Sequence, residues 1–214
     1  MSALFSPKAN RIARGGLVAL PLLAAATLVG LMVWVRTPAV TGQGRPATQP
    51  IPFDHRIHVT GLRIDCLYCH GTADRGASAG LPSTATCQPC HNDVWLSGPL
   101  FAPVRQSLAS GRPIPWRRVN QLPDFVYFNH AIHASGGIGC ESCHGRVDQM
   151  ARVSQAEPLT MAWCLDCHRN PERRRRPAEA ITAMGWRPSA RAAAPAPLTA
   201  ARRAAIVTCS ACHR

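Results

Sequence analysis

One pattern of cysteine and histidine dominates the sequence. The motif C-x-x-C-H occurs five times in 214 residues and uses all ten cysteines. Residues three apart in a helix share a face, so each pair of thiols can lie on one helical turn. We number the copies motifs 1 to 5 in chain order: Cys66/Cys69/His70, Cys87/Cys90/His91, Cys140/Cys143/His144, Cys164/Cys167/His168 and Cys209/Cys212/His213.

This spacing matches the attachment chemistry of c-type haem. Two thiols on one turn can add to the two vinyl groups, and the adjacent histidine then reaches the iron as its proximal ligand. Structural zinc sites and the disulfides of exported proteins also use paired cysteines. Neither of them requires a histidine directly after each second cysteine. The pattern therefore predicts five covalently bound haems c.

The four remaining histidines lie in a second pattern, F-x-H-x-I-H, which occurs twice. A histidine pair in an apolar setting is by default packed or zinc-binding. Because five irons each need a sixth ligand, we predict instead that His55, His58, His130 and His133 are distal ligands. Chain order assigns the first pair to motifs 1 and 2 and the second pair to motifs 3 and 4. Ligation that crosses between the modules stays open.

The fifth iron has no histidine left for its distal side. Met184, on an expected short helix between motifs 4 and 5, is the first candidate. Met161, three residues before Cys164, is the second. Either methionine could instead fill the core, which is the usual role of this residue.

The order of elements repeats, which indicates an internal duplication that starts at Phe53 and again at Phe128, 75 residues later. The expected organisation follows from these repeats. It comprises a cytoplasmic N-terminus at 1–16, a transmembrane helix at 17–35, a linker at 37–52, dihaem module 1 at 53–96, an inter-module segment at 97–127, dihaem module 2 at 128–172 and a C-terminal segment with the fifth haem at 173–214.

Regular structure is expected to be sparse, since little of the sequence alternates like a strand. Short helices are predicted at 103–110 before Gly111, at 177–184 before Gly185, and after Thr199 as N-cap. We therefore expect a single N-terminal transmembrane helix plus a multihaem cytochrome c domain. That domain should be cytochrome c3/c7-like, mostly coil with short helices, with haems filling its core.

Residues 17–35 carry no charge, and this length is enough for a helix to cross a membrane. Lys8, Arg11 and Arg14 precede the run, and no A-x-A-like cleavage site follows it. These features favour a retained anchor over a cleaved signal peptide. The positive-inside rule places the N-terminus in the cytoplasm and the haem domain on the periplasmic or outer side of the cell inner (cytoplasmic) membrane.

Composition agrees with a haem-filled domain. Aromatic residues are only 6% of the chain, so side chains alone look insufficient for a core. The net charge of +13 first suggests a nucleic-acid partner. Ten haem propionates would lower this charge to about +3 with ferrous irons, and Arg75, Arg117, Arg118 and Arg146 could pair with them. Arg173–Arg176 is interpreted as a solvated basic face. No nucleic-acid partner is expected.

Residues 116–133, 143–148 and 158–172 resemble one known family. With five haem motifs and a single span, the chain is similar to the membrane-anchored pentahaem cytochrome c subunit of alternative complex III. The modules alone also resemble tetrahaem cytochromes that accompany molybdopterin-type membrane oxidoreductases. The resemblance implies integral quinol-binding subunits and iron–sulfur, molybdoenzyme-like subunits as partners. It also implies a soluble cytochrome c, a copper protein or an oxidase as the electron acceptor.

The leading hypothesis is a non-catalytic electron-transfer subunit, because saturated irons exchange only electrons. A stand-alone multihaem quinol dehydrogenase that feeds a periplasmic reductase is one alternative. Its first haem motif would follow the membrane closely, whereas thirty residues separate Arg36 from Cys66 here. A multihaem reductase with one open iron is the other alternative, and the missing fifth distal histidine is its only support.

Overall fold

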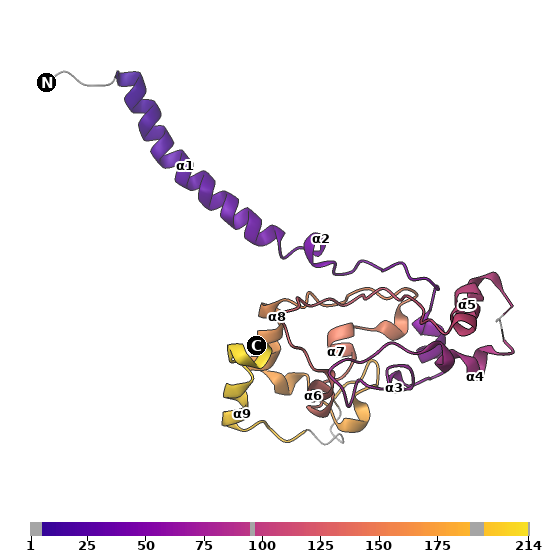
Figure 1. The fold of residues 1–214 in the computed structure, drawn as a ribbon. Coiled ribbons are helices and arrows are strands. Elements are labelled where there is room, and N and C mark those ends of the chain that lie inside the picture. The colour runs from indigo at the N-terminus through magenta and orange to yellow at the C-terminus, as the bar shows by residue number, and fades with distance from the viewer. Residues whose placement is uncertain (1–5, 95–96, 189–194, 214) are drawn as a thin grey trace. The chain divides into compact units, whose positions relative to one another are not determined.

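The computed structural model describes residues 6–94, 97–188 and 195–213, and its ribbon is drawn in Figure 1. The chain divides into two compact units, Met1–Gly42 and Gln43–Arg214. The first holds the apolar helix and the second holds all the haem motifs.

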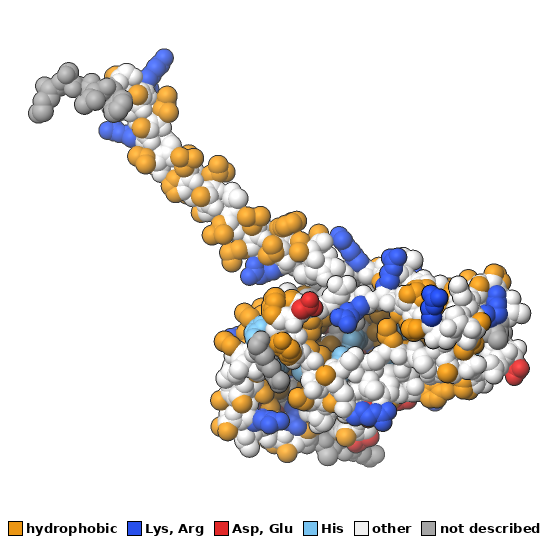
Figure 2. Space-filling view, viewed as in Figure 1, with side chains coloured by type: hydrophobic (Ala, Val, Ile, Leu, Met, Phe, Trp, Pro, Cys, Tyr) orange, Lys and Arg blue, Asp and Glu red, His pale blue; other side chains and the backbone are white. Residues whose placement is uncertain are grey.

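The first unit is built on one long helix, α1 (Pro7–Trp34). The Ser6 side chain accepts a hydrogen bond from the backbone N–H of Ala9, and proline occupies the first helical position, where its missing N–H is not needed. The helix is 28 residues long with a mean hydropathy of 2.3, so it is long and apolar enough to cross a membrane. Apolar side chains surround it on the face shown in Figure 2. A single turn, α2 (Pro38–Thr41), follows and ends at Gly42 in the left-handed region.

The second unit is mostly coil with short helices. Within its described residues, β-structure is limited to two isolated bridges, Pro46 with Ser154 and Ile138 with Arg175. This confirms the expected fold class, including the scarcity of strands. The α-helices are α3 (Cys66–Cys69), α4 (Gln88–His91), α5 (Ala102–Ser110), α6 (His130–Ser135), α7 (Glu141–His144), α8 (Met161–Arg169), α9 (Ala200–Ala205) and α10 (Cys209–Cys212). A π-helical turn spans Arg56–Gly61, and 3-10 turns span Thr84–Cys87, Pro99–Phe101, Val147–Gln149, Pro171–Arg173 and Ala178–Ala180.

The segment expected as a linker ends earlier than its composition suggests. Residues 43–52 belong to the second unit. The backbone N–H of Gly44 donates to the carbonyl of Gln155 at 2.7 Å, and that of Ala47 donates to Val153 at 3.3 Å. Of the expected linker 37–52, residues 43–52 therefore pack with the haem-motif unit through backbone hydrogen bonds to module 2.

Two of the expected short helices are confirmed and one is wrong. Helix α5 ends at Gly111, whose φ is 66°, and α9 begins after Thr199, whose side chain accepts from the N–H of Arg202. The helix expected at 177–184 is reduced to a 3-10 turn at Ala178–Ala180. The backbone carbonyls of this segment have other partners. The Arg176 guanidinium donates to the carbonyls of Ala180 and Ala183, and the Cys140 N–H donates to the carbonyl of Ile181.

The apolar core of the polypeptide is small. Among the described residues, Ile51, Val104 and Ile114 form one buried cluster, with Phe101, Leu108 and Trp116 packed against it. Large apolar side chains remain exposed near the motifs, such as Ile132 at 61% and Tyr68 at 53%. A domain of about 170 residues normally buries far more apolar surface than this cluster provides. The fold thus fits a core completed by bulky apolar groups other than side chains.

Candidate haem sites

All five C-x-x-C-H motifs lie on helical turns, as their spacing predicts. Motifs 1 and 5 form α3 and α10, motif 4 lies within α8, and the second cysteine and histidine of motifs 2 and 3 lie in α4 and α7. The Asp65 side chain caps motif 1 by accepting from the N–H of Leu67 at 2.8 Å. All ten thiols are free, and the described residues contain no cluster of three metal-ligating side chains. The helical turn of each motif, with a histidine beside its second cysteine, is the arrangement that thioether attachment of haem uses.

The thiols of the five motifs differ in exposure. Cys90, the second thiol of motif 2, is exposed, and so is Cys209 of motif 5. The other eight thiols are partly buried. The reason is local, because α4 is a single turn on which Pro89 and Cys90 face solvent while Cys87, just before it, is partly buried.

The two F-x-H-x-I-H segments have the same geometry. In module 1 the Phe53 ring meets His55 edge-on at 4.8 Å and stacks on His58 at 4.3 Å. In module 2 the Phe128 ring repeats this arrangement, with centroid distances of 4.7 Å to His130 and 4.4 Å to His133. The duplication inferred from sequence is therefore visible as a repeated aromatic arrangement, in which one phenylalanine separates the two imidazoles of each module.

Three of these imidazoles face a motif histidine across a constant gap. The ring centroids are 6.2 Å apart for His58 and His91, 6.4 Å for His130 and His144, and 6.1 Å for His133 and His168. Two imidazoles on opposite sides of one metal ion, with each nitrogen about 2 Å from it, have their centroids roughly 6 Å apart. The spacing of all three pairs therefore fits one iron between each pair.

His70 is the motif histidine close enough to His55 to affect its pKa. Burial lowers the pKa of His55 to about 4, and the nearby His70 lowers it further. The pKa of His144 is also lowered to about 4, first by burial and then by His130 and His70. Both rings lie in surroundings that favour the neutral imidazole, which is the form that binds a metal ion.

Backbone carbonyls orient seven of the nine histidines through Nδ1. A carbonyl oxygen can only accept, so Nδ1 must carry the proton, and Nε2 is left as the metal-binding nitrogen. The same tautomer in so many rings is what axial ligation of haem requires. The bonds run from His58 to Asp54, His70 to Gly80, His91 to Val94, His130 to Ala77, His133 to Asn129, His168 to Ile206 and His213 to Phe125, with distances from 2.6 to 3.2 Å.

His144 is oriented by a side chain that sequence analysis missed. Asn120 lies 3.0 Å from His144 Nδ1 through its amide nitrogen, while its buried Oδ1 has no hydrogen-bond partner. Rotating the amide by 180° places Oδ1 on His144 Nδ1–H and satisfies both groups. Asn120 is thus a positioning residue for the motif 3 histidine. It lies 24 residues before that histidine in a segment without a motif, so no local pattern marks it.

Thiols of different motifs lie close to one another. The neighbouring Cys140 thiol raises the pKa of Cys66, and burial adds to this effect. Burial raises the pKa of Cys143 to about 12, with further contributions from Cys167 and Cys164. Thiols of motifs 1 and 3, and of motifs 3 and 4, are therefore near neighbours.

The two methionines considered for the fifth iron lie in different places. Met184 lines a cavity of about 430 Å³ together with Cys66, beside motif 1. Met161 is 68% exposed and begins α8, one helical turn before Cys164. Burial and then the nearby Cys212 thiol of motif 5 raise the pKa of Cys164.

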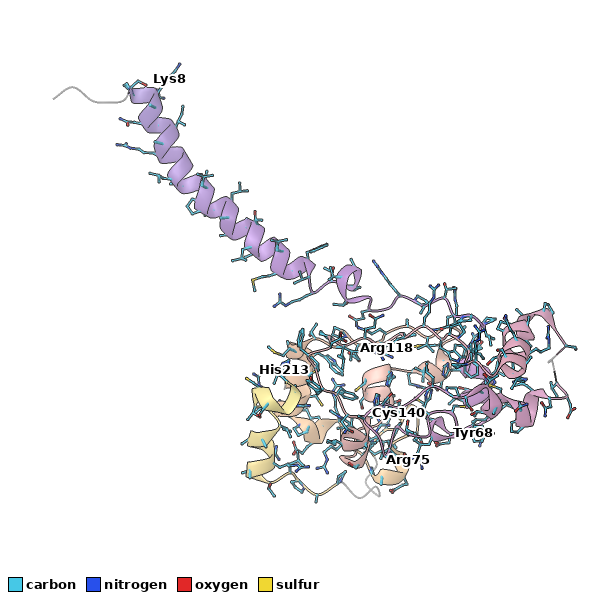
Figure 3. All side chains as sticks on the ribbon, in the orientation of Figure 1. Lys8, Tyr68, Arg75, Arg118, Cys140 and His213 are labelled. Atoms are coloured by element: carbon cyan, nitrogen blue, oxygen red, sulfur yellow. The ribbon has the colours of Figure 1, made fainter. Side chains whose placement is uncertain are left out.

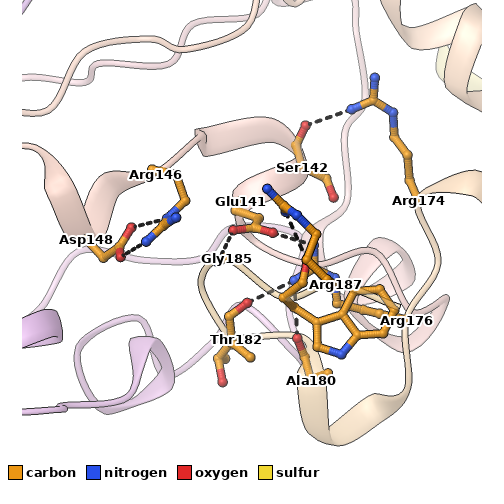
Figure 4. A network of polar contacts seen from close by, with 12 residues as sticks. Glu141, Ser142, Arg146, Asp148, Arg174, Arg176, Ala180, Thr182, Gly185 and Arg187 are labelled. Atoms are coloured by element: carbon orange, nitrogen blue, oxygen red, sulfur yellow. Dashed lines mark hydrogen bonds and ion pairs between the residues drawn. The ribbon is translucent and has the colours of Figure 1, made fainter. Parts of the chain in front are cut away.

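An arginine and carboxylate network, drawn in Figure 4, supports motif 3. Arg176 is buried and donates to Glu141, the second residue of the motif, at 3.0 Å. Arg146 is engaged with Asp148 at 2.6 Å. The view of Arg173–Arg176 as a solvated face is therefore wrong for Arg176. Its charge is matched by Glu141, a pairing that the chain separation of 35 residues hides from sequence analysis.

Parts of the chain are similar to known c-type cytochromes. Residues 126–214 match the family of cytochrome c7 and related cytochromes c. The chain is also 42% identical over 97 residues to the menaquinone reductase multihaem cytochrome c subunit of Nitratidesulfovibrio vulgaris. That alignment covers 45% of this chain and 45% of the relative, so the chain spans about half the length of the curated relative it matches.

Proposed function

We propose that this chain is a multihaem c-type cytochrome, supported by the match of residues 126–214 to cytochrome c7 and related cytochromes c and by its multihaem relative. From this basis we propose that it carries five covalently bound haems, one on each motif, and relays electrons as a subunit of a membrane quinone oxidoreductase. We number these haems as their motifs. The observation that carries this proposal is the three imidazole pairs 6.1 to 6.4 Å apart. An iron with histidine on both sides has no coordination position for a substrate and exchanges electrons alone.

The chain's own residues attach the haems, orient their axial ligands and supply positive charge around them. The cysteines fix each haem covalently, and the Nδ1 hydrogen bonds hold the imidazoles with Nε2 towards the metal. The haem supplies one-electron chemistry, whereas the protein sets its position and surroundings. Arg75, Arg117 and Arg118 are exposed and are not among the ion pairs of the described residues, so we assign them to haem propionates or partner surfaces.

We propose that α1 anchors the protein in the inner membrane with its N-terminus in the cytoplasm and its haem domain outside. Integral quinol-binding subunits and iron–sulfur subunits, as the resemblance to alternative complex III implies, are its proposed partners. Purification from native membranes in mild detergent should bring these subunits along, identified by mass spectrometry. Recovery of the cytochrome alone, with no integral subunit, would contradict the proposal.

The direction of electron flow separates two versions of this function. In the first version quinol reduces the haems, which pass electrons to a soluble cytochrome, a copper protein or an oxidase. In the second, favoured by the menaquinone reductase relative, electrons run towards the quinone. Quinol added to the oxidised complex should develop the ferrous α-band in the first version. A menaquinone analogue should reoxidise the reduced complex in the second.

For the fifth iron we propose Met161 as the distal ligand in place of Met184. Motif 5 lies beside Cys164, and Met161 occupies the same face of α8 one turn earlier. Met184 lies instead with motif 1. The ferric protein should show the weak near-infrared band of His/Met ligation, and Met161→Leu should remove it. Met184→Leu is the matched control and should leave it. Reduced wild type that binds carbon monoxide would show an open iron and favour a reductase.

A further inference from the structure

Equivalent residues of the two modules meet each other. Cys66 and Cys140 are each the first cysteine of their module, and neighbouring carbonyls of one segment hold both of them. The Cys140 N–H donates to Ile181 at 2.9 Å, and the Cys66 thiol lies 3.9 Å from the carbonyl of Thr182. Motifs 1 and 3 therefore share one supporting segment.

The surrounding contacts are reciprocal. The segment after motif 1 contacts His130, one of the two distal histidines of module 2. The Ala77 carbonyl accepts from both the N–H and Nδ1 of His130. The segment after motif 3 contacts the π-helical turn Arg56–Gly61, which contains the distal ligand His58 of module 1. The Asp148 carbonyl accepts from the Thr60 hydroxyl at 2.7 Å. Such mutual exchange of corresponding surfaces is the property of a two-fold interface. The modules thus meet head to head.

Motifs 2 and 4 lie on the other sides of motifs 1 and 3. Phe53 separates the distal ligands paired with motifs 1 and 2, and Phe128 separates those paired with motifs 3 and 4.

Motif 5 lies next to motif 4. His168 donates from Nδ1 to the carbonyl of Ile206 at 2.6 Å, three residues before Cys209. In Figure 3, Cys140 lies towards the middle of the haem unit and His213 at its edge. The fifth motif therefore extends the series on the module 2 side.

The exposure of the thiols agrees with this arrangement. Motifs 2 and 5 each contain one exposed cysteine, Cys90 and Cys209, whereas both cysteines of motifs 1, 3 and 4 are partly buried. A motif with other motifs on both sides has its thiols covered by their polypeptide, and a motif at the end of a series is open on one side. The two motifs with an exposed thiol are therefore the two expected at the ends.

We infer that the five haems form one unbranched row in the order 2–1–3–4–5, with haems 2 and 5 at its ends. The inference rests on the proposed five-haem electron transfer and adds the route to it. Haem 1, first in the chain, is internal in the row, and haem 2 is terminal. Electrons accordingly enter and leave at haems 2 and 5.

Two variants with the same chemical change test this order in the full-length holoprotein. His55→Met alters the distal ligand of haem 1, and His58→Met alters that of haem 2. Each change raises the potential of its own haem, which the near-infrared His/Met band identifies. Charge on one haem affects the potentials of adjacent haems most strongly, because Coulomb interactions fall with distance. The measurement is a redox titration of all five haems followed by electron paramagnetic resonance.

His55→Met should shift the potentials of two other haems, and His58→Met should shift that of only one. The reverse result would support the chain order 1–2–3–4–5 and overturn the inference. If either variant fails to incorporate five haems, an experimental structure of the wild-type holoprotein decides. The haem 1 iron should then lie nearer the haem 3 iron than the haem 2 iron does, and the opposite ranking refutes the row. Failure of the proposed function would appear separately, as fewer than five haems or no co-purifying quinone-binding subunit.

Discussion

The buried Arg176–Glu141 pair should be a main determinant of the stability of module 2. The two side chains are 6% and 12% exposed. The Arg176 guanidinium binds a Glu141 carboxylate oxygen at 3.0 Å, the Ala183 carbonyl at 3.0 Å and the Ala180 carbonyl at 3.4 Å. Gly139 leaves the space through which this side chain passes, since a Cβ there would collide with the guanidinium. Removing the arginine therefore leaves the Glu141 carboxylate without its counter-charge, with only the Gly185 N–H as a donor, and takes a donor from the carbonyls of Ala180 and Ala183.

Arg176→Met should lower the free energy of unfolding by about 3–5 kcal/mol, the usual cost of stranding one partner of a buried ion pair. With a urea dependence of about 2 kcal/mol per molar, the unfolding midpoint should fall by roughly 2 M. Urea titration of the detergent-solubilised holoprotein, followed by far-ultraviolet circular dichroism, measures this midpoint.

Two controls make the reasoning refutable. Arg203→Met removes the same type of side chain from the exposed pair with Glu172, where 43% and 35% of the side chains are accessible, and should change the midpoint far less. The double variant Arg176→Met/Glu141→Leu should recover most of the loss, because no unpaired charge remains. Equal midpoints for Arg176→Met and Arg203→Met would show that the buried pair does not contribute as argued.

Three further predictions concern the haems and the anchor. The intact mass should exceed that of the bare chain by five haem masses with no free thiol, and four haems or fewer would break the ligand assignment. Alkaline carbonate should leave the protein in membranes, and N-terminal sequencing should find residues before Leu17; a soluble form that begins after about Val40 would identify a cleaved signal. Asn120→Leu should shift the potential of haem 3, because it removes the hydrogen bond to His144 Nδ1. Asn120→Asp should retain an acceptor and keep haem 3 bis-histidine. A redox titration that is unchanged in both variants would assign Asn120 a structural role only.

The sequence predicts those parts of the sites that depend on short spacings. Two cysteines three apart with histidine adjacent define a helical turn, and all five turns form. The repeat of F-x-H-x-I-H likewise corresponds to matching stacks of histidine on Phe53 and Phe128. Each of these arrangements is contained in fewer than eight residues, so local geometry determines it.

Contacts between residues far apart in the chain could not be predicted from the sequence. Asn120 meets His144, and Arg176 meets Glu141, only through the fold, and neither contact leaves a periodic signal. The helix expected at 177–184 fails for the same reason. Its proline and glycine signals are correct locally, but tertiary partners take the carbonyls that a helix would use. The exposure of Cys90 is also a property of the fold, because its motif has the same spacing as the partly buried ones.

The paired rings have a consequence for how the molecule is assembled. In each module both distal histidines precede both attachment motifs along the chain, since His55 and His58 come before Cys66, and His130 and His133 come before Cys140. A polypeptide that is exported N-terminus first therefore presents its sixth ligands before the thiols that capture the corresponding haem. With the proposed ligation, each newly attached iron of motifs 1 to 4 would find its capping imidazole already emerged. During biogenesis this order would shorten the interval in which a five-coordinate iron faces oxygen and other small molecules outside the membrane.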